Sequence, residues 1–457
     1  MRIEWLKIQF FRCFYEYEIK FAPKATVLFG RNGVGKTSLI SALHKALSFV
    51  FFKDTKRRDD VTLTAGNSSL RVEGYDRKTD FMRDPKTGNA YPYINISAKG
   101  EIYSLPISWE MYASTSTFHL AKSGYKKTFT KFINQVNHFD ELPVLAYYSD
   151  SFPHVETKSK IDRSITGLRN FGYYQWNLEG ACSKMWIERL ERTIKTLERN
   201  TRIKEKIEEE MAFNPDVQHE AYERVLAEIS AARHEIDCVS ECLKQFTEGD
   251  EFLEVQELTL DAYDDKLAAL SSKGISYHFR KLPAGYKRLL YIVLDLSYRS
   301  FVLNNTVNSG GIVMIDEIDL HLHPGLEKEV LNRFITTFPR IQFIVSTHSP
   351  MVLTNLHTYG GECQIMRMEI GGDKPVVIED IYGLDYNSGV EDIMGVTAKN
   401  IEIDNLLNTL AYLMVNHADI QAQNVRELLL RKLRGDEKLL GEMVAKRIKE
   451  MGNEIHR

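Results

Sequence analysis

The sequence has few cysteines and no long apolar run. Five cysteines among 457 residues, an odd number, are too few for a disulfide framework and fit a reducing compartment. No stretch of about 18 apolar residues occurs, so we expect neither a membrane-spanning helix nor a membrane partner. Met1 to Trp5 carry no secretory signal pattern. These features predict a cytoplasmic protein.

An excess of charge of one sign is also missing. The chain has 59 Lys and Arg against 63 Asp and Glu, a formal net charge of −4. This balance excludes a globally basic nucleic-acid coat but is compatible with local basic patches. There is no internal repeat and no low-complexity tract. The length and a hydrophobic content of 43% predict a large core divided among two to four domains.

One glycine-rich stretch organises the chain. Residues 28–38 read LFGRNGVGKTS and match the phosphate-loop pattern GxxxxGK[ST] in full. An apolar run, Ala25 to Phe29, precedes it as a strand would, and leucines at helical spacing follow. Glycines let the backbone curl around a phosphate, and the helix N-terminus points N–H groups at the anion. The expected nucleotide-binding residues are Gly30, Arg31, Asn32, Gly33, Val34, Gly35, Lys36, Thr37 and Ser38.

Two side chains of this loop have separate roles in the expected chemistry. Lys36 reaches the β- and γ-phosphates, and the Thr37 hydroxyl is placed to bind Mg²⁺. The pattern therefore predicts ATP and Mg²⁺ as cofactors. A chance lysine after a glycine-rich turn is the alternative, and the flanking strand and helix argue against it.

A second apolar strand, Gly311 to Ile315, ends in two carboxylates. Asp316 is expected to bind Mg²⁺ or its water shell, and Glu317 to polarise the attacking water. Phosphoryl transfer needs little beyond such positioning and charge neutralisation. An Asp-Glu pair after a strand can also cap a helix, but its occurrence together with the phosphate loop favours the catalytic interpretation.

Two further segments complete the expected site. The buried strand from Ile341 ends in a polar turn with His348, which is expected to sense the γ-phosphate by a hydrogen bond. Gly285 stands at the start of a leucine-rich helix. A glycine-containing turn at a helix N-terminus binds anions, so Gly285 could meet a γ-phosphate held by another subunit.

Three other features have more than one interpretation. His321 and His323 could suggest zinc, but no second ligand pair is evident. Cys238 and Cys242 share a helix face and are expected to be packing residues. Arg12, near the first turn, lies over adenine in ATPases that begin this way, or is simply a surface arginine.

Residues 50–145 are expected to form a mostly β sheet beside the nucleotide site. The expected short strands are Val61 to Leu63, Ser69 to Val72 and Tyr93 to Ile96. Their loops contain basic residues that could touch DNA or RNA phosphates, although solvated loop charge is the commoner explanation. These residues are Lys53, Lys56, Arg57, Arg58, Lys122, Lys126, Lys127 and Lys131.

The remaining periodicity predicts helices in two places. Residues 180–246 predict an antiparallel helix pair with arms of about 30 residues, or about 45 Å. The last segment, from Ile401, predicts a helical unit with a break at Gly435. The expected α/β organisation is an ABC-type P-loop ATPase head with a flanking β-sheet, in four parts: 1–179, 180–250 (the insert), 251–390 and 391–457 (an assembly unit).

The motifs resemble those of ABC/SMC-like ATPases in order and spacing. Within that superfamily, the stretch Asp316 to Pro324, DEIDLHLHP, resembles the RecF/OLD-like ATPases of bacterial anti-phage systems. The length, the short helical insert and the helical tail look like the PtuA family of Septu systems, also found with retrons. The AriA family of PARIS systems is a close second. One departure is Pro283, which replaces the signature serine, so the resemblance implies slow or regulatory hydrolysis.

The resemblance implies a homo-oligomer that sandwiches ATP and regulates a separate nuclease in phage defence. The nuclease is expected to be separate because no Toprim-like acidic cluster follows the ATPase. The resemblance implies an HNH enzyme in the Septu case and a Toprim enzyme in the PARIS case. The alternative is a DNA-repair or recombination ATPase that binds DNA directly. The absence of long arms and the slightly acidic charge argue against it.

Overall fold

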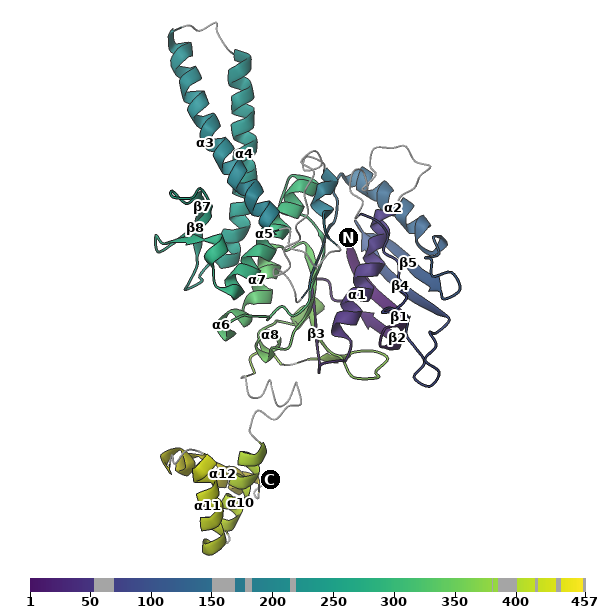
Figure 1. Cartoon of the computed structure of the whole chain (residues 1–457), viewed down its shortest axis with the longest axis vertical. Coiled ribbons are helices and arrows are strands. Elements are labelled where there is room, and N and C mark those ends of the chain that lie inside the picture. Colours follow the sequence, from purple (N-terminus) through teal and green to yellow (C-terminus); the bar gives the residue numbers. More distant parts are fainter. Residues whose placement is uncertain are drawn as a thin grey trace. The chain divides into compact units, whose positions relative to one another are not determined.

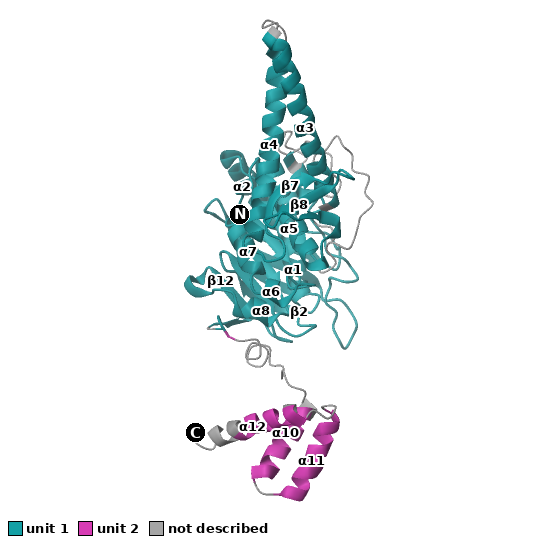
Figure 2. Ribbon diagram, turned by 90° about the vertical axis from the view of Figure 1, so that its left-hand side faces the viewer, with its two compact units in different colours: residues 1–383 teal, residues 384–457 magenta. Residues whose placement is uncertain are grey.

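The computed structural model describes most of the chain, and the described residues fall into two compact units. The described ranges are 1–52, 70–149, 169–176, 183–213, 219–379, 381–384, 401–415, 418–432 and 437–454. One unit comprises residues 1–383 and the other residues 384–457 (Figure 2). Further subdivision of the first unit stays a prediction.

The core of the first unit is a six-stranded sheet with the order β13-β12-β3-β11-β10-β6. Its inner strands are parallel to their neighbours, and β13 pairs antiparallel at one edge. β3, β10 and β11 are buried at every position, which explains their mostly apolar sequences; the polar exceptions are Thr26, Gln342 and Ser346. The strands are β3 (Ala25–Phe29), β6 (Val144–Tyr148), β10 (Gly311–Ile315), β11 (Ile341–Ser346), β12 (Cys363–Arg367) and β13 (Val376–Ile378).

Helices cover both faces of this sheet. Figure 1 shows α1 (Lys36–Leu47) on one side and α5 (Ala284–Asn304) with α7 (Val330–Thr337) on the other. α5 is buried along most of its length, as its apolar sequence requires. The shorter helices are η1 (Ser48–Phe51), η3 (Arg169–Tyr173), η4 (Phe279–Lys281), α6 (Pro324–Glu327), α8 (Pro350–Thr354) and η5 (Tyr359–Gly361).

The expected flanking sheet is antiparallel, with the order β2-β1-β4-β5. Its strands are β1 (Arg2–Phe11), β2 (Phe14–Lys20), β4 (Tyr93–Ile102) and β5 (Leu105–Ser114). The strand expected at Tyr93 is therefore confirmed as the start of β4. The strand expected at 69–72 is wrong for its described part, because 70–72 have no regular structure. Residues 53–69, with four of the basic residues and the strand expected at 61–63, lie outside the described residues.

A helix replaces one of the expected loops. Residues Ser123–Phe139 form α2, so the prediction that Lys126, Lys127 and Lys131 lie on loops is wrong. Tyr125, Phe129, Phe132, Ile133 and Val136 are buried at helical spacing, and the lysines between them lie on the exposed face, the pattern of an amphipathic helix. α2 lies along β5 (Figure 1), where Oγ1 of Thr128 donates to the Ser108 carbonyl at 2.6 Å.

The expected helix pair is formed by α3 (Ser183–Phe213) and α4 (His219–Thr247). A bidentate ion pair joins them, with both Arg189–Glu235 contacts at 2.8 Å. A small antiparallel sheet follows, formed by β7 (Val255–Leu260), β8 (Leu267–Ser271) and β9 (Ser276–His278). The hairpin joins the ATPase head at its base, where α4 packs on α5 and α7 (Figure 1).

The second unit consists of α10 (Ile401–Val415), α11 (Asp419–Lys432) and α12 (Glu437–Glu454). Leu407, Leu410, Leu429, Leu440 and Val444 form its small core. The predicted helical character is confirmed. A further break lies between α10 and α11, where the sequence has no glycine or proline that would predict it. The predicted break at Gly435 lies outside the described residues.

Candidate functional site

The candidate site lies at the edge of the central sheet where parallel strands end. Ser346 of β11 pairs with Leu28 of β3, and Val345 pairs with Ile315 of β10. The segments that follow these three strands are therefore neighbours. Ligands of open α/β sheets bind at the carboxyl ends of the strands. This edge brings together the phosphate loop, Asp316 with Glu317, and His348.

The phosphate loop has a backbone that requires glycine. Gly30, Gly33 and Gly35 have φ of 147°, 83° and 101°. A Cβ on Gly30 would come within 2.5 Å of the Met368 carbonyl oxygen, and one on Gly35 within 2.7 Å of Cys13 Sγ. Side chains therefore cannot be accommodated at these positions without rearrangement.

Lys36 lies across the loop. Its ammonium donates hydrogen bonds to the carbonyls of Gly30, at 2.8 Å, and Arg31, at 3.2 Å. Burial lowers the pKa of Lys36, and the carboxylates of Asp316, Glu317 and Asp319 act in the opposite direction. The lysine thus stands in the electrostatic field of all three acids.

The other loop residues divide into anchors and exposed groups. Val34 is buried, and Ser38 is hydrogen-bonded to the thiol of Cys13, whose pKa is raised mainly by burial. Thr37 is exposed at the start of α1, together with Arg31, Asn32 and Gly33. The Thr37 hydroxyl and the Asp316 carboxylate are hard oxygen donors, the kind that Mg²⁺ takes together with phosphate oxygens. The residues therefore fit the expected ion.

Asp316 is held from three sides. Its N–H donates to the Tyr148 carbonyl at 2.8 Å, and its own carbonyl accepts from Arg288 Nη2 at 2.9 Å. The Ser346 hydroxyl donates to its Oδ1. The side chain is only 2% exposed. Such support fixes the direction of a carboxylate before any ligand arrives.

Glu317 has a strained backbone. Its φ is +50°, in the left-handed region, and its N–H donates to the Ser346 hydroxyl at 2.8 Å. Such conformations cost about 1–3 kcal/mol and cluster at active sites. The turn directs the chain away from β10 immediately after Asp316, and Glu317 is half-buried.

Asp319 links the segments that follow β10 and β11. Its Oδ1 accepts a 2.6 Å hydrogen bond from Oγ1 of Thr347 and a 3.3 Å bond from the His348 N–H. Next to them, the Ser349 hydroxyl donates to Glu327, whose pKa is raised mainly by burial. These bonds set the backbone position of the half-buried His348.

Gly285 lies near the start of α5, after Pro283 at the N-cap. A Cβ on Gly285 would come within 2.6 Å of the His321 carbonyl oxygen, so close packing already explains the glycine. The described contacts of residues 283–287 run to Asp250, Phe252, Tyr291 and His321, and none runs to the phosphate loop. Contact with a nucleotide in another subunit stays a prediction.

Arg12, His323 and Cys242, for which the sequence allowed more than one role, each have ordinary structural contacts. Arg12 donates to the buried Asp80 at 3.0 Å, a carboxylate that Lys45 also approaches, at 3.1 Å. Nδ1 of His323 accepts from the Gly325 N–H and caps α6. Cys242 is buried, as expected of a packing residue.

One group in the described ranges has metal-ligand spacing, and sequence inspection did not suggest it. Asp261, Asp264 and His278 place three ligand atoms within 4.8 Å of one another on the small sheet. Nε2 of His278 is 3.3 Å from Oδ1 of Asp264, a distance that an ordinary ion pair or hydrogen bond explains.

Sequence reasoning missed three residues that support this edge. Ser346 and Asp319 orient the acidic strand end, and the buried Arg288 binds its backbone. A signal existed for Ser346, since a hydroxyl at the carboxyl end of one parallel strand lies beside the end of the next. A buried arginine in a leucine-rich helix gives no comparable signal.

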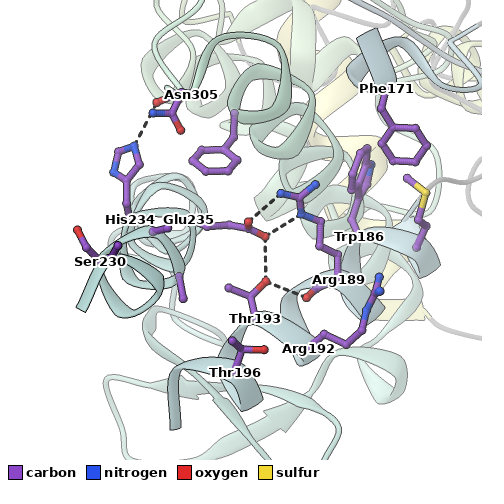
Figure 3. A pocket seen from close by; sticks show the side chains of 15 residues that line it. Phe171, Trp186, Arg189, Arg192, Thr193, Thr196, Ser230, His234, Glu235 and Asn305 are labelled. Atoms are coloured by element: carbon purple, nitrogen blue, oxygen red, sulfur yellow. Dashed lines mark hydrogen bonds and ion pairs between the residues drawn. The ribbon is translucent and has the colours of Figure 1, made fainter. Parts of the chain in front are cut away.

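A cavity of about 800 Å³ lies elsewhere, between α3, α4 and the end of α5 (Figure 3). Its central polar group is Glu235, which binds Arg189 and the Thr193 hydroxyl. Glu235 is thus already paired within the hairpin. Trp186 forms part of the wall and connects this cavity to the core.

Trp186 is hydrogen-bonded to a buried aspartate. Asp295 of α5, 1% exposed, accepts hydrogen bonds from Trp186 Nε1 at 2.5 Å, Tyr148 Oη at 2.6 Å and Arg299 Nε at 2.6 Å. Tyr148 ends β6, and its carbonyl binds the Asp316 N–H. One contiguous set of contacts therefore joins the base of α3 to the acidic strand end.

Comparisons with known proteins show the family of the chain. A family model for the AAA ATPase domain, AAA_15, matches residues 1–353. The chain is 24% identical over 362 residues to the Retron Vc95 probable ATPase of Vibrio cholerae serotype O1 biovar El Tor, covering 72% of this chain and 67% of that protein. It is 40% identical over 78 residues to the Septu protein PtuA of Bacillus mycoides (strain KBAB4), covering 16% and 11%.

Among solved structures, the chain resembles the SMC head domain from Thermotoga maritima. The TM-score is 0.42 at 13% identity, covering 83% of this chain and 100% of that one. A helix with the length and apolar character needed to cross a bilayer is absent from the part of the chain that the structure describes.

Proposed function

Because the chain belongs to the AAA ATPase domain family (AAA_15) and is an ATPase, we propose that it hydrolyses ATP between two copies of itself and thereby controls a separate nuclease in anti-phage defence. The observation that carries the proposal is the convergence of Lys36, Asp316 and Glu317 at one sheet edge. The names of the retron and Septu relatives support the defence context.

Each residue of this edge has a role in the proposed reaction. Loop N–H groups and Lys36 bind the phosphates, while Thr37 and Asp316 hold Mg²⁺, which neutralises charge on the phosphates when bound. Glu317 accepts a proton from the attacking water. His348 donates a hydrogen bond to the γ-phosphate from a backbone position set by Asp319.

The position of Gly285 supports the proposed association of two copies. The described contacts of residues 283–287 do not reach the phosphate loop of the same chain. In our proposal the N-terminus of α5 instead donates its N–H groups to the γ-phosphate of a nucleotide held by the second copy. Helix N-termini favour anions through both their free N–H groups and their dipole. Pro283 supplies no hydroxyl, so hydrolysis is slow and bound ATP acts as a regulatory signal.

The route from nucleotide to partner runs through Asp295. A change in position at Asp316 alters its bond with the Tyr148 carbonyl, and the Tyr148 hydroxyl and Trp186 share Asp295. The base of α3 therefore responds to the nucleotide state, and the α3–α4 hairpin is the element that transmits it. This is a spatial connection that double-mutant cycles can test for energetic coupling.

The test measures native mass with and without ATP and Mg²⁺, using Glu317→Gln to slow turnover. We expect ATP to increase the mass of this variant by association, and Lys36→Ala to abolish the increase. An unchanged mass for Glu317→Gln would contradict association through ATP.

A second experiment addresses the nuclease. The chain is purified with the product of its adjacent gene, and DNA cleavage is measured with ATP, without ATP and with Lys36→Ala. We expect a stable complex whose cleavage activity depends on ATP. A partner that cleaves equally in all three conditions, or no complex at all, would contradict nuclease control.

A further inference from the structure

α2 carries basic side chains and no acidic ones. Its 17 residues include no Asp or Glu, although acids outnumber bases in the whole chain. Lys122 at the N-cap, Lys126, Lys127 and Lys131 are all exposed. α3 instead mixes both signs and forms pairs such as Lys204–Glu208, at 3.0 Å.

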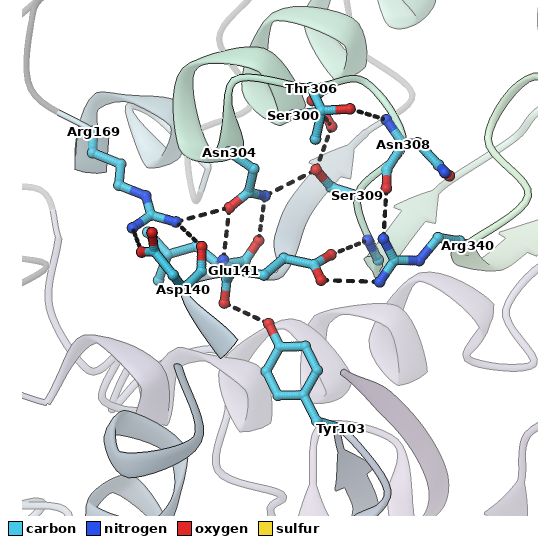
Figure 4. A network of polar contacts seen from close by, with 12 residues as sticks. Tyr103, Asp140, Glu141, Arg169, Ser300, Asn304, Thr306, Asn308, Ser309 and Arg340 are labelled. Carbon is cyan, nitrogen blue, oxygen red and sulfur yellow. Dashed lines mark hydrogen bonds and ion pairs between the residues drawn. The ribbon is translucent and has the colours of Figure 1, made fainter. Parts of the chain in front are cut away.

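Nearby carboxylates do not neutralise these lysines. None of the four has a side-chain ion pair within the described ranges. The two acids after α2 are already paired, Asp140 with Arg169 at 2.5 Å and Glu141 with Arg340 at 2.9 Å (Figure 4). Glu110 of β5 lies beside the first turn, where its backbone and Cβ pack on Gly124; its carboxylate is exposed and forms no ion pair with these lysines in the described ranges. The helix therefore presents uncompensated positive charge to solvent.

This arrangement is unfavourable for the helix itself. The N-terminus of a helix carries a partial positive charge, and its first turn favours acids, of which α2 has none. Lys122 with Lys126 and Lys127 with Lys131 are like charges at i,i+4, and each such pair destabilises a helix. Helix stability therefore does not explain the pattern, and a ligand that neutralises it would.

We propose that the exposed side of α2 binds the sugar–phosphate backbone of nucleic acid. From Lys122 to Lys131 the helix rises about 13 Å at 1.5 Å per residue. Lysines spread over this length can contact several phosphates of one strand. Asn134, Asn137 and His138 continue the exposed side with further polar groups and no carboxylate. Lysines, amides and hydroxyls are the groups that contact phosphates in protein–nucleic acid complexes.

This surface goes beyond the proposed function and does not depend on it. α2 lies along β5, and its lysines take no part in the nucleotide site. Because such contacts go to the backbone, binding is insensitive to sequence and sensitive to salt. Each phosphate contact lowers the slope of log K against log salt concentration by about 0.9 for duplex and 0.7 for single strands.

The test is fluorescence anisotropy with labelled nucleic acids. The probes are duplex DNA, single-stranded DNA and RNA of about 30 nucleotides, over salt from about 50 to 200 mM. One variant changes Lys122, Lys126, Lys127 and Lys131 to Gln, a good helix former. The matched control changes Lys7, Lys24, Lys195 and Lys204 to Gln, which removes the same charge from lysines that have acidic partners.

The α2 variant is expected to lose at least about tenfold in affinity, with a slope reduced by up to about 3.6 for duplex DNA. The control should retain the wild-type slope, and both variants should hydrolyse ATP normally. Glu317→Gln should bind nucleic acid as the wild type does, which separates this proposal from the catalytic one. Three results would overturn it: no binding by the wild type, equal losses in the two quadruple variants, or an α2 variant that loses only its protein partner.

Discussion

Oδ1 of Asp319 accepts a 2.6 Å hydrogen bond from Oγ1 of Thr347, and this bond ties the ends of two parallel strands together. The same oxygen accepts from the N–H of His348. Asp319 is therefore a positioning residue: it acts on the nucleotide site through the residues after β11. Its carboxylate also contributes to the field around Lys36.

Asp319→Asn is expected to slow ATP hydrolysis without a large change in KM. A hydrogen bond to a charged group contributes about 1.5–3 kcal/mol, which corresponds to about 10- to 100-fold in kcat. In a double-mutant cycle, Asp319→Asn should slow ATP hydrolysis little further once His348→Ala is present. Both changes would remove the same contribution, because Asp319 acts through His348. Full additivity of the two changes would show that Asp319 does not act through His348.

Lys36 gives a prediction in pH. Since burial lowers its pKa, the ammonium loses its proton at a lower pH than an ordinary lysine, whose value is 10.5. ATP affinity should therefore begin to fall with rising pH below that value. Lys36→Arg keeps its charge over this range, so its ATP affinity should show no such fall. The affinity that this variant retains measures the contribution of the other contacts to ATP. Calorimetric titration with ATP over alkaline pH measures both, and a wild-type affinity that is constant up to pH 10.5 would contradict the assignment.

The same shift has a consequence for stability. A folded-state pKa below the unfolded value means that the charged lysine destabilises the fold at neutral pH, and the penalty is relieved as pH rises between the two values. Lys36→Met should thus retain or raise the melting temperature without nucleotide, and should lose the increase that ATP produces. A large destabilisation of Lys36→Met would indicate that the lysine is chiefly structural.

Asp295 is expected to contribute strongly to the stability of the fold. Asp295→Ala leaves Arg299 buried and removes the acceptor of Trp186 and Tyr148. Removing one member of a buried ion pair costs about 3–5 kcal/mol in the free energy of unfolding. The matched control is Asp265→Asn, because Asn tolerates the left-handed φ of 56° at this position. It removes an exposed carboxylate that pairs with Lys195 and should cost under about 1 kcal/mol. Urea denaturation measures both, and equal costs would contradict the account of the buried network.

Gly285 provides a test of association that leaves the phosphate loop intact. Gly285→Ala introduces a Cβ within 2.6 Å of the His321 carbonyl, so the start of α5 must shift. We expect ATP binding to persist while ATP-dependent association and hydrolysis are lost. At Gly74 a Cβ meets nothing within 4 Å, so Gly74→Ala is the control. If Gly285→Ala associates and hydrolyses ATP normally, the N-terminus of α5 does not contact the nucleotide of a second copy.

Periodicity and motif order predicted the α/β head and the helical hairpin correctly. The resemblance to the retron and Septu ATPases is confirmed by the comparisons. The strands β3, β10 and β11 were predictable because a buried parallel strand is mostly apolar.

Other features could not be predicted from local pattern. α2 was missed although its buried residues recur at helical spacing, because residues 50–145 as a whole were predicted to be mostly β. The contacts of Asp319 with Thr347 and of Asp295 with Trp186 join residues far apart in the chain. Only the order of strands in the sheet and the packing of α5 bring them together.

ATP hydrolysis by Glu317→Gln tests the central claim most directly. The account predicts that hydrolysis falls by about 10²- to 10⁴-fold, the usual contribution of a general base, while ATP affinity stays near that of the wild type. Ser346→Ala, which removes a hydroxyl that binds both Asp316 and the Glu317 N–H, should show a smaller loss. Hydrolysis by Glu317→Gln at the wild-type rate would contradict the assignment of the site.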